Sequence, residues 1–247
     1  MLTYKQLSLF PDWEQKIISQ VRTFRSISTI ASNISDCNKR KLKFENEHLL
    51  HGIPREGILE TPKAQPVYLK NMPKLYIPFN CLKKCNTTHV CVHFYIDDYR
   101  FNRVWQNLEH YMEMFEKYDV VISTDNSVFL DVPLIDNMCN VFKNRVFTAV
   151  GQRMGVNVIP SFSCGNPKDI DLYCDGLPDG GCIAVGGMGT NKNRSERAIF
   201  KYCVREMCER KHPNLLLIYG NNTDLDLDIP VVRIPTYVEN LRKRLSK

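Results

Sequence analysis

Six short apolar runs in the last two thirds of the chain constrain the fold more than any other feature. They are rich in β-branched residues and alternate with amphipathic stretches long enough to form helices. The runs cover residues 88–96, 119–123, 156–162, 182–187, 214–220 and 231–234, and the amphipathic stretches cover 100–117, 133–154 and 195–211. Strands that are apolar on both faces indicate a parallel sheet covered by helices. The sequence therefore predicts an α/β fold with a mainly parallel sheet, open or curled into a partial barrel.

Residue composition and the expected secondary structure divide the chain into three parts. We expect an N-terminal helical and irregular extension over residues 1–50, a Pro-rich linker over 51–78 and the α/β domain over 79–247. In the extension, Asp12 is a reasonable N-cap for a helix to about residue 26, since apolar side chains recur there at helical spacing.

Composition narrows the class of protein. Of 247 residues, 43% are hydrophobic, which is enough for a buried core. No apolar run approaches the roughly 18 residues that span a bilayer, and the N-terminus does not resemble a secretory signal. We therefore expect a cytoplasmic protein without membrane contact, in which the ten cysteines are reduced thiols or metal ligands.

Positive charge is concentrated in the first 90 residues, which carry 14 Lys and Arg against 7 Asp and Glu. The densest cluster contains Lys39, Arg40, Lys41 and Lys43. Such a cluster can lie along a phosphate backbone, so nucleic acid is a predicted partner. An ordinary solvated surface is the simpler explanation of the same residues.

Acidic residues follow two of the predicted strands. Asp97 and Asp98 close the first run, and Asp125 follows the second. Ligands of parallel sheets bind at the carboxyl ends of the strands, and Mg²⁺ takes carboxylate oxygens. These three residues are therefore the candidate catalytic carboxylates, with Mg²⁺ as the candidate cofactor. The alternative is that they cap the following helices.

A glycine-rich stretch after the fourth run suggests a phosphate site. Gly187, Gly189, Thr190, Asn191 and Lys192 lie between a strand and a helix, where backbone N–H groups can approach an anion. The spacing fits neither the G-x-G-x-x-G nor the Walker A pattern, and a simple turn is the alternative. At other strand ends, the predicted pocket residues are Asn166, Tyr219 and Asn221.

One group of soft ligands is close in sequence. Cys81, Cys85, Cys91 and His93 lie within thirteen residues. Structural zinc sites usually place their second ligand pair farther along the chain. A buried core position is the simpler interpretation of His93, so no metal site is assigned to this group.

The stretch QLSLF near the N-terminus resembles the pentapeptide with which bacterial replication and repair proteins bind the sliding clamp. All five positions, Gln6, Leu7, Ser8, Leu9 and Phe10, agree with the usual form of that motif. The resemblance implies that the apolar side chains fill a cleft on the clamp while Gln6 hydrogen-bonds at its rim. The alternative is that they pack against this protein's own fold.

A second resemblance covers residues 75–222. The blocks VHFYIDDYRFNRVW, YDVVISTDN, GVNVIPSFSCGNP and IAVGGMG resemble domain of unknown function 4417, a family of phages and other mobile elements. The family typically carries an Asp at the position of Asp125 and a Trp-Gly-acid motif after the next strand. Here Cys164, Gly165 and Asn166 occupy the latter positions, and an amide cannot act as a carboxylate base.

Two hypotheses of function follow. The first is a phage or mobile-element accessory protein of DNA replication, which docks on the host sliding clamp, to be recruited by it or to block it, and binds nucleic acid or a nucleotide. The second is a metal-dependent enzyme of phosphoryl transfer or hydrolysis, acting on nucleic acid or a phosphorylated small molecule.

Overall fold

The computed structural model describes residues 45–187, 194–220, 225–239 and 242. The chain divides into two compact units, Met1–His51 and Gly52–Lys247. The described part of the first unit contains the 3₁₀ helix η2 (Glu47–Leu50). The second unit is an α/β structure, so the predicted fold class is confirmed. None of the helices in the described ranges is long and apolar enough to cross a membrane.

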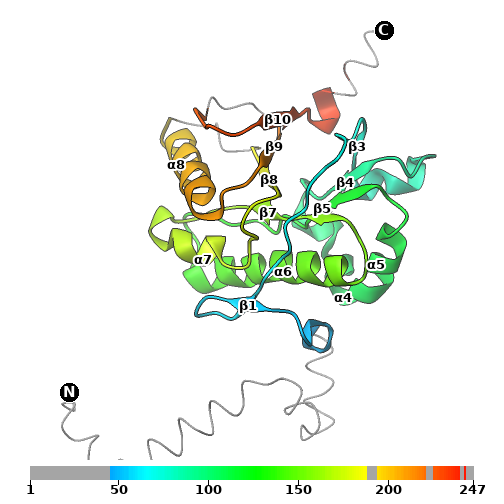
Figure 1. Ribbon diagram of the computed structural model, residues 1–247, viewed down its shortest axis with the longest axis horizontal. Helices are drawn as coiled ribbons and strands as arrows, with labels where there is room; N and C mark the ends of the chain where they lie inside the picture. The colour runs from blue at the N-terminus through cyan, green and yellow to red at the C-terminus, as the bar shows by residue number, and fades with distance from the viewer. Residues whose placement is uncertain (1–44, 188–193, 221–224, 240–241, 243–247) are drawn as a thin grey trace, which may run out of the picture. The chain divides into compact units, whose positions relative to one another are not determined.

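Parallel strands form two four-stranded sheets in the second unit (Figure 1). The first has the order β3-β4-β5-β6 and the second the order β10-β9-β8-β7, with all neighbours parallel. The strands are β3 (Tyr76–Pro78), β4 (Cys91–His93), β5 (Val120–Ile122), β6 (Val158–Ile159), β7 (Ser161–Phe162), β8 (Cys182–Gly186), β9 (Leu215–Tyr219) and β10 (Val231–Ile234). Each of the six predicted runs contains at least one strand, whereas β3 was not predicted.

A proline divides the third predicted run between the two sheets. β6 pairs with β5, and β7 pairs with β8. Pro160 lies between β6 and β7 and has no N–H to donate to a ladder. Its carbonyl oxygen accepts a hydrogen bond from the Ala184 N–H at 2.9 Å, so the chain passes directly from one sheet into the other.

The two sheets curl around a shared interior. One cluster of buried side chains draws on β4, β5, β6, β8, β9 and β10. The His93 ring of β4 lies 4.5 Å from the Tyr219 ring of β9, although these strands belong to different sheets. No pairing joins β3 to β10 among the described residues. The arrangement is therefore a partial barrel, one of the two forms that the sequence predicts.

Side-chain alternation along β4 separates interior from exterior. Cys91 belongs to the interior cluster, and the rings of His93 and Tyr95 contact Tyr219. Phe94 instead contacts the rings of Phe79, Phe101, Phe115 and Phe147 outside the sheet. Successive side chains of a strand point to opposite faces. The side chains of this apolar run therefore pack alternately into the barrel interior and into the core outside the sheet.

Helices cover the exterior of the sheets. They are α4 (Asn102–Gln106), α5 (Leu108–Phe115), α6 (Leu134–Arg153), α7 (Ile170–Cys174) and α8 (Arg194–Lys211), with 3₁₀ helices η3 (Phe79–Lys84), η4 (Asp98–Arg100) and η5 (Pro167–Asp169). The predicted stretches 133–154 and 195–211 match α6 and α8. The stretch 100–117 is divided because Asn107 has a non-helical backbone, with φ −138° and ψ 52°. A second buried cluster joins α6, α7 and α8 to the outer faces of β7, β8 and β9.

Residues 52–78, which fall in the predicted Pro-rich linker, are hydrogen-bonded along the α/β unit. They include the antiparallel pair β1 (Arg55–Glu56) and β2 (Thr61–Pro62), and β3. The Val67 carbonyl accepts from the Cys182 N–H at 2.7 Å, and the Gln65 N–H donates to the Gln152 side chain at 2.7 Å. The sheet thus begins before residue 79.

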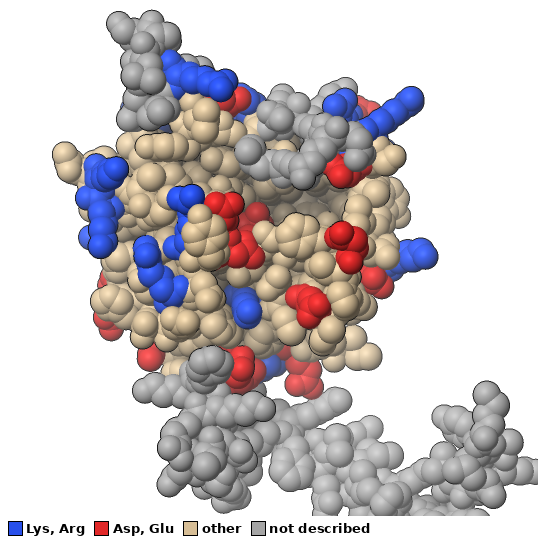
Figure 2. Space-filling view, turned by 180° about the vertical axis from the view of Figure 1, so that it is seen from behind, with Lys and Arg blue, Asp and Glu red and all other residues tan. Residues whose placement is uncertain are grey.

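Charges on one face of the molecule are unevenly placed. In Figure 2, acidic side chains lie around a hollow near the centre, whereas basic side chains lie mostly toward the left of the view. The acidic side chains thus gather on the part of this face that is hollowed.

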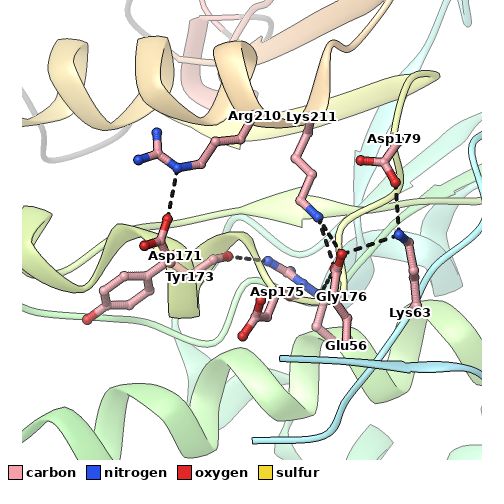
Figure 3. A network of polar contacts seen from close by, with 10 residues as sticks. Glu56, Lys63, Asp171, Tyr173, Asp175, Gly176, Asp179, Arg210 and Lys211 are labelled. Carbon is pink, nitrogen blue, oxygen red and sulfur yellow. Dashed lines mark hydrogen bonds and ion pairs between the residues drawn. The ribbon is translucent and has the colours of Figure 1, made fainter. Parts of the chain in front are cut away.

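A polar network attaches the β1–β2 hairpin to the helices (Figure 3). Lys211, at the end of α8, donates to both carboxylate oxygens of Glu56 at 3.0 and 2.9 Å. Glu56 also accepts from the Gly176 N–H at 2.8 Å and from Lys63 at 3.3 Å. Burial alone would raise the pKa of Glu56, but these hydrogen bonds lower it below its usual value. The carboxylate is therefore held ionised between two loops and a helix.

We expect the two lysines of this network to differ in their effect on stability. The Lys211 side chain is 8% exposed and that of Lys63 is 31% exposed. Lys211→Met should lower the free energy of unfolding by roughly 1–3 kcal/mol, because it leaves a partly buried carboxylate without its main partner. Lys63→Met is the matched control, with an expected loss of less than about 1 kcal/mol. Urea denaturation measures both, and equal losses would contradict the ranking.

Candidate functional site

The three predicted carboxylates lie in different surroundings. Asp97 is exposed and pairs with Arg100 at 3.0 Å. Asp98 accepts hydrogen bonds from the Ser127 N–H at 3.0 Å and the Ser127 hydroxyl at 2.9 Å. Asp125 lines a cavity. Within the described residues, no three His, Cys, Asp or Glu side chains are close enough together to hold a metal ion. Of the three predicted carboxylates, Asp125 alone lines this cavity.

A chain of hydroxyl groups ends at Asp125. The Ser161 hydroxyl donates to Asp125 Oδ1 at 3.1 Å, and the Tyr95 hydroxyl lies 3.2 Å from Ser161 Oγ. Because Ser161 uses its only proton toward Asp125, Tyr95 donates to Ser161. Tyr95 in turn stacks on Tyr219, with ring centroids 4.8 Å apart. A continuous series of contacts in the barrel interior thus runs from Tyr219 through Tyr95 and Ser161 to the carboxyl group of Asp125.

A glycine allows this close approach. A Cβ atom at Gly186, the last residue of β8, would lie 3.1 Å from Asp125 Oδ2 and 3.1 Å from two carbons of the Tyr95 ring. Distances in this range are shorter than nine in ten of the contacts that Cβ atoms make in proteins. The absence of a side chain at residue 186 lets β8 pass beside Asp125 and Tyr95.

The surroundings of Asp125 favour its protonated form. Burial is the largest cause, and the nearby charge of Asp98 adds to it. The Ser161 hydrogen bond and the Arg145 charge act in the opposite direction, and the net result is a pKa of about 7. A carboxyl with such a pKa can hold or release a proton at neutral pH, which is the property of a general acid or base.

Three asparagines of α6 hold the loop that carries Asp125. The buried Asn144 side chain accepts from the Thr124 hydroxyl and the Asn126 N–H, at 3.1 and 2.9 Å. Asn140 donates to the Ser127 carbonyl at 2.7 Å, and Asn137 bonds both backbone groups of Phe129. An amide both donates and accepts, so it can replace the backbone partners that an irregular loop lacks. The position of Asp125 therefore depends on α6.

The cavity has a volume of about 540 Å³, within the usual range for small-molecule sites. It lies between the loops after β5 and β7, the end of β8 and one face of α8. The lining residues are Asp125, Ser127, Val128, Phe129, Leu130, Asp131, Phe162, Ser163, Cys164, Gly165, Val185, Gly186, Glu196, Ile199, Phe200, Cys203 and Val204. It therefore opens at the carboxyl ends of the strands, where the sequence predicts the site.

Several of the predicted site residues do not line the cavity. Gly187 is buried, and its N–H donates to the Tyr219 carbonyl at 2.8 Å. Asn166 caps η5 by accepting from the Lys168 N–H, and the Tyr219 hydroxyl accepts from the Tyr237 N–H. Neither of these two side chains lines the cavity. The remaining predicted residues lie outside the described ranges: Gln6, Leu7, Ser8, Leu9, Phe10, Lys39, Arg40, Lys41, Lys43, Gly189, Thr190, Asn191, Lys192 and Asn221.

The four candidate metal ligands Cys81, Cys85, Cys91 and His93 do not form a metal-binding group in the described structure. Cys91 and His93 are buried in the barrel interior, whereas Cys81 and Cys85 are partly exposed. Burial lowers the pKa of His93 to about 3, so its ring is neutral. Its Nδ1 atom has no hydrogen-bond partner among the described residues. His93 is thus a core residue, as expected.

Sequence reasoning missed Tyr95 and Ser161 as site residues. Both lie inside apolar runs, which were interpreted as strand interiors. The signal that could have identified them is the period of two, because Tyr95 follows the interior residues Cys91 and His93, and Ser161 follows the interior residue Ile159. A polar group on the interior face of a buried strand requires a partner.

Comparison with known proteins identifies the family. The sequence profile described as "Domain of unknown function (DUF4417)" matches residues 53–234. The chain belongs to this family. The chain is 29% identical to the "Gene 1 protein" of Mycobacterium phage D29 over 214 residues, 83% of this chain and 77% of that protein. It is 33% identical to the "Gene 1 protein" of Mycobacterium phage L5 over 154 residues, 62% of this chain and 67% of that protein. No solved structure matches it significantly.

Both the predicted family and its association with phages are thereby confirmed. The DUF4417 match covers the partial barrel from before β1 to the end of β10, and so includes all residues that line the cavity.

The raised pKa of Asp125 gives stability a defined dependence on pH. In the unfolded chain the carboxyl ionises near 3.8, and in the folded protein near 7. Between these values the folded state binds the proton and the unfolded state does not. Stability from this group is therefore present below about pH 4 and lost as the pH rises to about 7, by up to about 4 kcal/mol.

Asp125→Asn removes this titration. We expect wild type to lose stability relative to the variant as the pH rises from about 4 to 7. Urea denaturation at a series of pH values measures the difference. Parallel profiles for the two proteins would show that Asp125 does not titrate in this way.

Proposed function

We propose that the protein is an accessory protein of phage DNA replication that binds a nucleotide, or an unpaired nucleotide of a nucleic acid strand, in the cavity beside Asp125. The N-terminal peptide Gln6–Phe10 recruits it to the bacterial sliding clamp. The proposal has two separable parts, ligand binding by the DUF4417 domain and clamp binding by the peptide.

One observation carries the first part. Asp125 lines a cavity of about 540 Å³ at the carboxyl ends of parallel strands, the usual place for nucleotides in such folds. The walls combine aromatic and aliphatic side chains with a few polar groups. This mixture suits a nucleobase, which has apolar faces and polar edges.

The second part is supported by the full agreement of QLSLF with the clamp-binding pentapeptide and by the family's occurrence in phages. A short peptide with apolar anchors is a common means of docking on a preformed cleft. The basic cluster Lys39–Lys43 lies between this peptide and the domain in sequence, where it can meet nucleic acid.

Asp125 also favours a second candidate function, acid–base catalysis. Its pKa of about 7 and its hydrogen bond to Ser161 suit a general acid or base acting on a bound ligand, for example in hydrolysis. The metal-dependent form of this candidate fits the described residues poorly, because both oxygens of Asp98 already accept from Ser127 and Asp97 pairs with Arg100.

Filling the cavity tests the first part. Val128 is half-buried and lines the cavity, whereas Leu59 is exposed in the β1–β2 turn. Val128→Trp should abolish binding of nucleotides or single-stranded oligonucleotides, because the indole occupies the ligand's volume. Leu59→Trp, which adds the same side chain elsewhere, should leave binding unchanged. Calorimetric titration of both variants measures this, and undiminished binding by Val128→Trp would contradict the site.

Clamp recruitment is tested independently. Leu9→Ala/Phe10→Ala should reduce retention on immobilised sliding clamp by about 100-fold or more, because two apolar anchors are lost. Lys5→Ala, just outside the pentapeptide, is the control and should bind like wild type. Retention of the double variant at the wild-type level would remove the clamp from the proposal.

A further inference from the structure

The described residues that line the cavity include acidic side chains and no basic ones. They carry three carboxyl groups, those of Asp125, Asp131 and Glu196, and none of these lining residues is Lys, Arg or His. A phosphate inside such walls would be repelled. A nucleotide would therefore enter with its base, and its phosphate would remain outside the cavity.

Aromatic side chains are available to the base. Phe129 and Phe200 line the cavity, and Phe129 is 54% exposed. Aromatic rings are the common stacking partners of unpaired bases, and such stacking discriminates little between bases. Selection of one base must then come from a polar group.

Asp125 is the polar group best placed to select the base. One of its oxygens, Oδ1, accepts a hydrogen bond from Ser161, and Oδ2 lies close beside Gly186. Asp125 and Gly186 both line the cavity. An ionised carboxylate has about four acceptor sites, and among the described residues Ser161 alone donates a hydrogen bond to Asp125. Asp125 forms no ion pair within the described part of the chain, because the guanidinium of the nearby Arg145 donates to the carbonyls of Asp175, Ser161 and Tyr173.

We infer that the cavity selects guanine, whose N1–H and N2 amino group donate side by side to the two oxygens of Asp125. The inference rests on the proposed nucleotide site and names its specificity. Guanine alone among the common bases presents two adjacent donors on its Watson–Crick edge. Adenine and cytosine present a donor beside an acceptor, which would face a carboxylate oxygen. Two donors also favour the ionised form of the carboxyl, against the effect of burial.

Nucleosides test the selection without any contribution from phosphate. We expect guanosine to bind wild type roughly tenfold more tightly than inosine, which lacks the N2 amino group, since one hydrogen bond to a charged acceptor is lost. Adenosine should bind more weakly still. Isothermal titration calorimetry measures all three.

A variant designed to change the preferred base provides a second test. Asp125→Asn has nearly the same shape but presents one acceptor and one donor. It should lose the preference for guanosine and prefer xanthosine, which has an oxygen in place of the N2 amino group. Asp97→Asn, the same substitution at an exposed residue outside the cavity, should keep the wild-type preference.

The outcomes separate this inference from the proposed function. Equal binding of guanosine and adenosine by wild type, or a guanosine preference that survives in Asp125→Asn, would overturn guanine selection and leave the nucleotide site standing. If folded wild type binds no nucleoside, nucleotide or oligonucleotide, both the inference and the proposed site are overturned.

Discussion

The buried guanidinium of Arg145 is the interaction on which the site depends. The residue is 1% exposed, and its side chain donates to three backbone carbonyls, those of Asp175, Ser161 and Tyr173, at 3.0, 2.8 and 2.8 Å. Burial lowers the pKa of Arg145 to about 10, so the group remains charged at neutral pH. One residue of α6 thus joins β7 to the end of α7, and no water is needed to satisfy these carbonyls. This contact fixes the strand that presents the Ser161 hydroxyl to Asp125.

The same helix supports the other side of the site. Three asparagines of α6, Asn137, Asn140 and Asn144, hold the loop after β5, and Arg145 follows the last of them. The buried polar residues of α6 are Asn137, Asn144, Arg145 and Thr148. Because each polar group has a partner, the helix costs little in unmade hydrogen bonds and positions both Asp125 and Ser161. A binding site can then be built on loops without losing a defined geometry.

Much of the fold was predictable because it is encoded locally. The period of the apolar residues identified strands β4 to β10 and helices α6 and α8, since burial on both faces leaves a continuous apolar run. Strand β3 was missed because its sequence, Tyr76–Pro78, is short and lies among prolines. The break at Asn107 was missed because helical periodicity continues on both sides of it. The division at Pro160 was not anticipated, although the residue itself marks where a ladder must change.

The candidate site was predictable only in part. The sequence by itself determined that polar residues follow the strands and that Asp125 lies at one of these ends, because chain order and parallel pairing bring such ends to one edge. Only the tertiary structure decided which of them share a cavity. Asp97 and Asp98 are adjacent to a strand as Asp125 is, yet they face Arg100 and Ser127. The curl of the sheets brings Tyr95, Ser161 and Gly186 to Asp125, and this depends on packing between residues that are far apart in the sequence, which no local pattern records.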